Sequence, residues 1–151
     1  MQGNDGDVAL ENMRESIRNK PNDATKFMTY RTELNPRLGT HEVYGENVYI
    51  PDYLRQAFTR VRLMSHELKV ETGRWSRLPR EERVCSCNNE TVQDEKHVLL
   101  DCLLLAHIRL EYQDLDYSSI CNLLSSEGNC LKLCKFVFEV TRFIKNLSVI
   151  W

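Results

Sequence analysis

Four residues of the types that bind metal ions lie close together in this 151-residue chain. Cys85 and Cys87 form a close pair, and His97 and Cys102 follow after a short polar stretch. Zn²⁺ prefers thiolate and imidazole ligands, and four of them arranged as a tetrahedron close a structural site. A turn bearing the cysteine pair, facing a helix start bearing the other two residues, supplies this arrangement. We therefore predict one structural zinc ion, whose binding contributes directly to folding.

The same residue types also permit other interpretations. Free cysteine is among the most buried residue types, so a core position is the alternative for each predicted thiolate ligand. The gap between Cys85 and Cys87 is also one residue shorter than in the usual zinc knuckle. His107 is an alternative ligand, whereas His41 and His66 lack nearby partners and are expected to be ordinary surface or core residues. The remaining cysteines fall on apolar helix faces and are predicted to be core residues: Cys121, Cys130 and Cys134.

Several helices are predicted to position the metal ligands. Beyond Pro51, apolar residues recur at helical spacing and predict a core-facing helix that Gly73 ends: Leu54, Phe58, Val61, Met64 and Leu68. Asp94 is predicted to cap a helix that runs to about Tyr112, and a short helix is expected at 118–124. The last predicted helix spans 129–151 and has one broad apolar face: Leu133, Phe136, Val137, Val140, Ile144 and Leu147.

The first third of the chain is predicted to be an extension. An amphipathic helix is expected at 8–19, and a second helix around Phe27, Met28 and Tyr30. A turn-rich linker at 35–47 follows. We predict an N-terminal helical extension and linker at 1–48, and a helical zinc-binding domain at 49–151. The predicted fold class is mainly α, a small helical domain with a short zinc-stabilised hairpin or turn.

Charge is distributed unevenly along the chain, although the formal net charge of −2 selects no class of partner. Seven basic and two acidic residues lie between Tyr53 and Arg80, whereas eight acidic and two basic residues lie between Cys85 and Gly128. The basic stretch predicts contacts with RNA or single-stranded DNA through these side chains: Arg55, Arg60, Arg62, Lys69, Arg74, Trp75, Arg77 and Arg80. Stacking of Trp75 on an unpaired base would be worth about 1–3 kcal/mol. The alternative is that Trp75 packs in the core and the arginines pair with the acidic half of the chain.

The segment from Ser65 to Cys102 resembles the zinc-binding segment downstream of the reverse transcriptase in non-LTR (LINE-type) retrotransposon proteins. Shared features are a basic helix, Arg83 before the cysteine pair, an acidic residue shortly before His97, and four residues between His97 and Cys102. In the family a proline usually follows the last cysteine, whereas Leu103 stands here. The resemblance covers about 53–112. It implies an accessory role in nucleic-acid binding, in RNA handling and target-primed reverse transcription.

Enzymatic activity is not expected. The Tyr-x-Asp-Asp polymerase signature is absent, so the chain should not extend a primer by itself. Asp52, Glu67 and Lys69 match the residue types of a Mg²⁺-dependent nuclease site. Such sites need neighbouring strands, however, and a helix is predicted here.

The predicted surroundings are those of an intracellular protein, nuclear or cytoplasmic. No secretory signal is recognised at the N-terminus, and no apolar run reaches the ~18 residues of a membrane span. In such a compartment thiols stay available as metal ligands. A further alternative function is protein interaction, in which the terminal helix, tipped by Trp151, docks into a partner or pairs with itself.

Overall fold

The computed structural model describes residues 5–19, 32, 34–35 and 39–149. The described part of the chain is mainly helical, as predicted. Its α-helices are α1 (Asp5–Arg18), α3 (Asp52–Arg62), α4 (Lys69–Trp75), α5 (Ala106–Glu111), α6 (Ile120–Ser125) and α7 (Cys130–Val149). Short helical turns are η2 (Glu42–Tyr44), η3 (Arg80–Glu82), η4 (His97–Asp101) and η5 (Leu103–Leu105). Within the described ranges, strand-like pairing is limited to one antiparallel bridge between Val84 and Val92.

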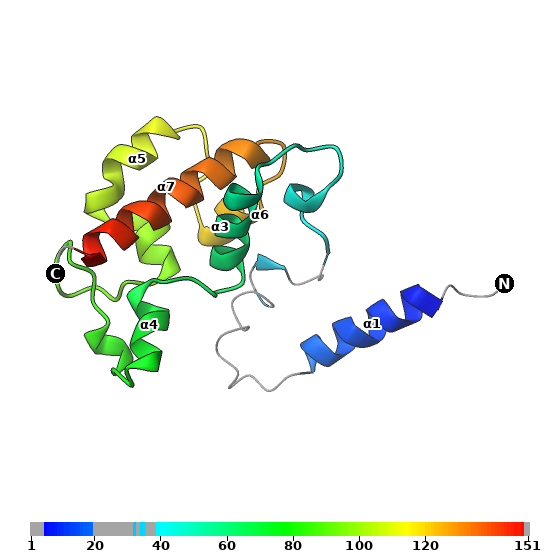
Figure 1. Cartoon of the computed structure of the whole chain (residues 1–151), viewed down its shortest axis with the longest axis horizontal. Coiled ribbons are helices and arrows are strands. Elements are labelled where there is room, and N and C mark those ends of the chain that lie inside the picture. The colour runs from blue at the N-terminus through cyan, green and yellow to red at the C-terminus, as the bar shows by residue number, and fades with distance from the viewer. Residues whose placement is uncertain (1–4, 20–31, 33, 36–38, 150–151) are drawn as a thin grey trace.

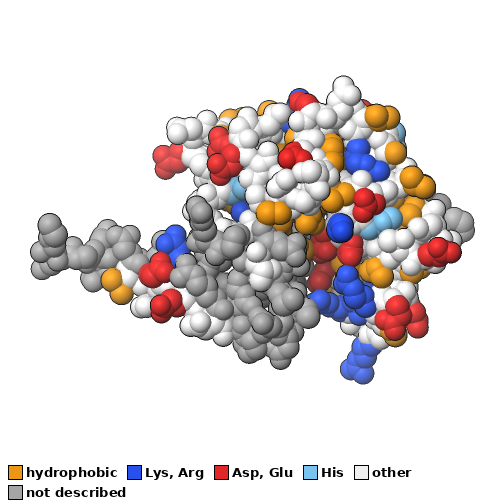
Figure 2. Space-filling view, turned by 180° about the vertical axis from the view of Figure 1, so that it is seen from behind, with side chains coloured by type: hydrophobic (Ala, Val, Ile, Leu, Met, Phe, Trp, Pro, Cys, Tyr) orange, Lys and Arg blue, Asp and Glu red, His pale blue; other side chains and the backbone are white. Residues whose placement is uncertain are grey.

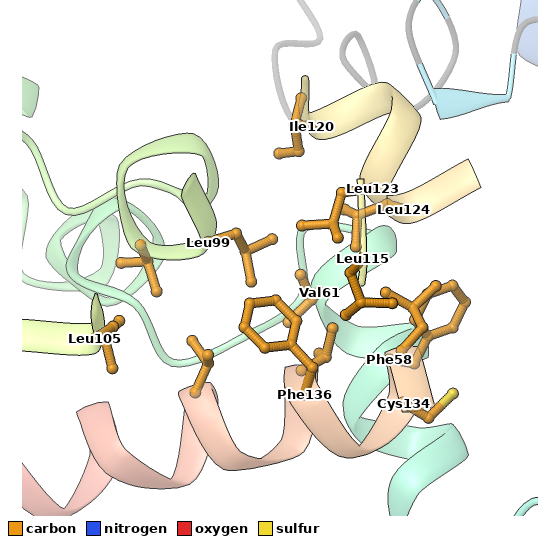
Figure 3. Packing of buried hydrophobic residues seen from close by; sticks show 14 of the residues in the cluster. Phe58, Val61, Leu99, Leu105, Leu115, Ile120, Leu123, Leu124, Cys134 and Phe136 are labelled. Atoms are coloured by element: carbon orange, nitrogen blue, oxygen red, sulfur yellow. The ribbon is translucent and has the colours of Figure 1, made fainter. Parts of the chain in front are cut away.

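The core forms where α3 packs against α7, with α5 and α6 beside them (Figure 1). Side chains from different helices meet there, including Phe58 of α3, Leu123 of α6 and Phe136 of α7 (Figure 3). All five predicted core residues between Leu54 and Leu68 are buried. The predicted face of the last helix is buried too, except for the half-buried Leu147. Hydrophobic periodicity therefore identified the two main packing faces.

The predicted helix from Pro51 to Gly73 is wrong in its length, because the helix ends at Arg62 and a second one, α4, begins at Lys69. The N–H of Ser65 donates to the carbonyl of Arg60 at 2.7 Å, and the N–H of Met64 donates to that of Val61 at 3.1 Å. These two bonds form a Schellman motif, which needs a left-handed residue and usually takes glycine. Met64 takes this role here, with φ of 54°.

Gly73 is not a helix C-cap, since it lies inside α4. A Cβ atom at Gly73 would come within 2.6 Å of Cδ of Arg83. The Arg83 guanidinium passes this point and donates to the carbonyls of Val70 and Leu78, each at 2.8 Å. Glycine is therefore needed for a close approach rather than for a turn.

The predicted continuous helix from Asp94 to Tyr112 is also wrong. Asp94 does cap a helical turn, because its Oδ1 accepts the N–H of His97 at 3.0 Å. The helix then breaks at Cys102, whose extended backbone separates η4 from η5 and α5. The carbonyl of Cys102 accepts the N–H of Leu105 at 3.2 Å and the guanidinium of Arg109 at 2.5 Å. The short helix expected at 118–124 is present as α6, capped by Ser119.

The N-terminal part contributes to the core through its last residues. Leu34, His41 and Val43 are buried, and the hydroxyl of Ser125 donates to the carbonyl of Leu34 at 2.9 Å. The predicted helix at 8–19 is confirmed as α1, which lies away from the other helices in Figure 1. The second predicted helix, with Phe27, Met28 and Tyr30, falls outside the described residues, as does Trp151. The domain boundary near residue 48 stays a prediction.

Among the described helices, none is both long and apolar enough for a membrane crossing.

Candidate metal centre

Cys85 and Cys87 lie on a tight hairpin that follows α4 and η3. The N–H of Cys85 donates to the carbonyl of Thr91 at 2.8 Å, and the N–H of Gln93 donates to that of Arg83 at 2.8 Å. Asn89, at the tip, has a left-handed backbone with φ of 57°, which asparagine tolerates better than most residues. The hairpin holds both thiols on one side and aims them at η4.

His97 and Cys102 reach the same point because η4 is wider than an α-helical turn. In a regular α-helix, residues five apart are turned by about 140° around the axis and face different directions. Here the N–H of Cys102 donates to the carbonyl of His97 at 2.7 Å, which closes a π-type turn. The two side chains are then one full turn apart, on the same side. Such π-turns often occur at functional sites.

The four predicted ligands converge, with their ligand atoms all within 4.8 Å of one another. Sγ of Cys85 lies 3.8 Å from Sγ of Cys102, and Sγ of Cys87 lies 3.2 Å from Nε2 of His97. Zn–S bonds of about 2.3 Å would place two sulfurs of a tetrahedral site about 3.8 Å apart. Cys85, His97 and Cys102 are buried, and Cys87 is half-buried. The cluster therefore fits a metal ion in both donor chemistry and spacing.

The three thiols differ in their pKa values because their surroundings differ. Burial raises the pKa of the Cys102 thiol to about 12, and the neighbouring Cys85 adds to this effect. Burial also raises the pKa of Cys87. For Cys85 burial acts in the same direction, but hydrogen bonds from the Cys87 backbone and the Gln93 amide outweigh it, so its pKa is lowered. A bound cation would lower the pKa of all three thiols, because a coordinating thiol loses its proton.

Gln93, which sequence analysis did not single out, connects this cluster to α4. Its side-chain Nε2 donates to Sγ of Cys85 at 3.7 Å, and its Oε1 accepts the N–H of Lys69 at 3.0 Å. Its backbone carbonyl accepts the N–H of Val70 at 3.2 Å. Two of the N–H groups that the start of a helix leaves unpaired are thereby satisfied. A buried glutamine has no distinctive signal in one sequence, so only the fold reveals this role.

Other predicted or alternative residues lie outside the cluster. His107 is exposed, and its ring packs against Phe143 at 5.3 Å between centroids. His66 is buried and forms a 2.5 Å contact with the carboxylate of Glu95. Cys130 and Cys134 are core residues, as predicted, and Cys121 is half-buried.

The predicted nucleic-acid residues are only partly brought together. Arg74, Trp75 and Arg77 lie at the end of α4 and directly after it, and the Trp75 side chain is 76% exposed. Trp75 therefore does not pack in the core. Arg60 is exposed on α3 and lines the same cavity as Trp75. Arg62, in contrast, is only 5% exposed.

The remaining members of this set make contacts within the chain. Arg55 pairs with Asp52 at 3.5 Å, and Arg80 pairs with Asp94 at 3.0 Å. The ammonium group of Lys69 donates to the carbonyl of Val84 at 2.9 Å. The arginines thus pair with acidic residues at some positions and remain exposed at others. In Figure 2, basic side chains gather on the lower right of the molecule, the side on which α4 lies once the view is turned.

The residues of the hypothetical nuclease site are engaged separately. Asp52 pairs with Arg55, Glu67 pairs with Lys145 at 3.2 Å, and Lys69 binds the hairpin carbonyl described above. These contacts give the nuclease hypothesis no support.

Comparison of the chain with protein-family models, curated proteins and solved structures finds no match.

Proposed function

We propose that this chain is a zinc-binding module that binds RNA or single-stranded DNA and has no catalytic activity of its own. The observation that carries the proposal is the exposure of Trp75 between Arg74 and Arg77, on a short helix fastened to the candidate metal centre. An exposed aromatic ring among cations suits the stacking of unpaired bases and contact with phosphates. The resemblance to retrotransposon reverse transcriptase proteins supports the same role, as an accessory to reverse transcription inside the cell.

The proposed ion is Zn²⁺. Three thiols and one imidazole form the soft, four-donor set of structural zinc sites. With four protein ligands the ion would have no open position for a water molecule, so it would stabilise the fold rather than act in catalysis. The hairpin between Cys85 and Thr91 buries few apolar residues, so a bound ion would supply stability that apolar packing does not.

A tight turn at the end of α4 places Arg77 close to Trp75. The backbone of Arg77 has a left-handed conformation, with φ of 55°. The N–H groups of Arg77 and Leu78 close a second Schellman motif at the end of α4. Glycine is the usual residue there, and a side chain costs about 1 kcal/mol. The turn tolerates this cost, as it does at Met64, and it leaves the exposed Arg77 two residues from the exposed Trp75.

Metal analysis of the purified protein tests the first half of the proposal. We expect one zinc ion per chain and a large fall in melting temperature when a chelator removes it, because bound metal stabilises only the folded state. The Cys102→Ser variant should bind zinc poorly, whereas the Cys121→Ser variant should bind it normally. Full zinc binding by the Cys102 variant would contradict the ligand assignment.

A binding series in increasing salt tests the second half. We expect binding of a labelled single-stranded RNA or DNA oligonucleotide at low salt, and a steep loss as salt rises, because phosphate contacts release counterions. The zinc-free protein serves as the control. Absence of binding at 50 mM salt would end the proposal.

A protein-interaction role is the second candidate function. The apolar face of α7 is occupied by the core, but Leu103 and Leu110 are 77% and 72% exposed. Exposed apolar residues mark a contact surface where they form a contiguous patch, and these two leucines are candidates for one. A dimer in solution that Leu110→Glu converts to a monomer would favour this candidate over nucleic-acid binding.

A further inference from the structure

A cavity of about 650 Å³ lies between α3, α4 and α7. None of the four candidate metal ligands lines it. Three buried apolar side chains, Val61, Leu68 and Ile144, form its floor, and the exposed Trp75 stands at its edge. Its volume falls in the range of pockets that enclose a small molecule or one flat ring system.

Part of the lining of this cavity is aromatic and carries a cation. The rings of Tyr53 and Phe138 meet edge to face, with 5.0 Å between their centroids. The guanidinium of Arg142 lies 5.6 Å from the centroid of Phe138. These contacts fix the wall in place and leave Arg142 exposed at the rim.

Positive charge prevails at the rim of the cavity. Arg60, Arg142 and Lys145 are exposed there, against one exposed acid, Glu67, which pairs with Lys145 at 3.2 Å. A second acid, Glu71, is buried and pairs with Arg74 at 3.6 Å. Figure 2 likewise shows basic and acidic side chains close together on the lower right of the face. An anionic ligand with an aromatic ring would be complementary to this rim and its walls.

We infer that this cavity binds a single-stranded nucleic acid by taking one unpaired base against Trp75, while Arg60, Arg142 and Lys145 contact the adjoining phosphates. The inference rests on the proposed function and adds a defined site, with α7 as a second source of phosphate contacts. A duplex keeps its bases stacked and paired, so insertion of a base would first require it to unpair. The site therefore selects single strands over duplexes.

Two double variants on α7 test the inference. Arg142→Gln with Lys145→Gln removes two cations at the cavity, and Lys132→Gln with Lys135→Gln removes two from the same helix outside it. Both lower the net charge equally, and melting curves establish that each variant folds. The probes are labelled single-stranded RNA, single-stranded DNA and duplex DNA of equal length.

We expect the cavity variant to lose about tenfold in affinity for single strands at 0.1 M salt. Its salt slope should fall by about 1.4, because each phosphate contact to a single strand contributes about 0.7. The control variant should keep the wild-type slope. Equal binding by the cavity and control variants, with normal wild-type binding, would overturn the inference and leave the proposed function standing.

Tryptophan fluorescence provides a second measurement. The chain has two tryptophans, so the Trp151→Phe variant reports on Trp75 alone. Stacking on a base should quench this emission with single strands and leave it unchanged with duplex DNA. Equal quenching by duplex DNA would overturn the inferred base site. Failure of the wild-type protein to bind any probe at low salt would end the proposed function, and this inference with it.

Discussion

At the scale of single residues, Gln93 carries two roles that can be separated by substitution. Its amide nitrogen faces a sulfur of the metal centre, and its amide oxygen holds the start of α4. Outer hydrogen bonds of this kind orient a ligand and adjust its charge, and their removal typically lowers metal affinity 10–100-fold.

We predict that Gln93→Glu weakens zinc binding by about tenfold or more, because the carboxylate keeps the acceptor for Lys69 but replaces the donor to Cys85 with a negative charge. Competition with a coloured chelator measures the affinity. The Co²⁺ absorption spectrum shows whether the coordination is still tetrahedral. Unchanged affinity would mean that Gln93 serves only to hold α4.

A second residue-scale prediction concerns Arg77. In Arg77→Gly, relief of the left-handed strain, about 1 kcal/mol, is offset by the chain entropy of glycine, about 0.5–1 kcal/mol. The free energy of unfolding should therefore change by less than about 0.5 kcal/mol, while oligonucleotide affinity falls. Asn89→Gly is the matched control, since Asn89 is also left-handed but carries no charge. Loss of binding in the control alone would contradict the role given to Arg77.

At the scale of elements, α4 depends on contacts from the hairpin rather than on its own sequence. The helix has only seven residues. Its N-cap residue is Leu68, whose side chain forms no hydrogen bond with the first N–H groups. Gln93 pairs with N–H groups at the beginning of α4. Arg83 donates to the carbonyl of Val70 in the first turn and to that of Leu78 just beyond the end. A change in the hairpin should therefore be transmitted to the residues that α4 displays.

We predict that Gly73→Ala destabilises the fold by about 1–3 kcal/mol, because the added methyl group displaces Arg83 and breaks its hydrogen bonds to the carbonyls of Val70 and Leu78. Gly39→Ala is the control, since a Cβ there meets no atom within 4 Å. Urea unfolding of the two variants gives the comparison. Equal stability of both would show that Arg83 can move without cost.

Some elements could be predicted from sequence and others could not, for physical reasons. Helical spacing identifies Phe58, Val61 and Phe136 as core residues, because burial of one helix face leaves a direct pattern. The end of α3 after Arg62 leaves no such pattern in the sequence, since Met64 takes a position where glycine is the usual signal. The widened turn at η4 is equally hidden, although it aligns His97 with Cys102.

At the scale of the whole molecule, the segment before α3 is tied to the core through a buried histidine. The ring of His41 packs on Phe58 at 5.2 Å, and its Nδ1 accepts the N–H of Val43 at 3.1 Å. Burial lowers the pKa of His41 below its usual value of 6.5, and the charge of Arg62 lowers it further. The folded protein therefore holds this histidine in its neutral form.

We predict that the protein loses stability as the pH falls below about 6.5, down to the lowered pKa of His41. In that window the unfolded chain binds a proton that the folded chain does not, so the free energy of unfolding decreases with acidification. One such proton gives at most about 1.4 kcal/mol per pH unit. In His41→Phe, urea unfolding between pH 7 and 5 should show a shallower dependence. An unchanged slope would mean that other groups cause the loss.

The 3.8 Å between the sulfurs of Cys85 and Cys102 also determines how the metal-free protein responds to air. A small shift would bring them to the roughly 2 Å of a disulfide bond, with dissolved oxygen accepting the two hydrogens. We expect metal-free samples stored without reductant to lose the mass of two hydrogen atoms. These samples should also stop binding zinc until a dithiol reduces the disulfide. Metal-loaded samples should resist, because the ion occupies the thiolates. Mass spectrometry of both samples after equal exposure would distinguish true loss of function from reversible oxidation.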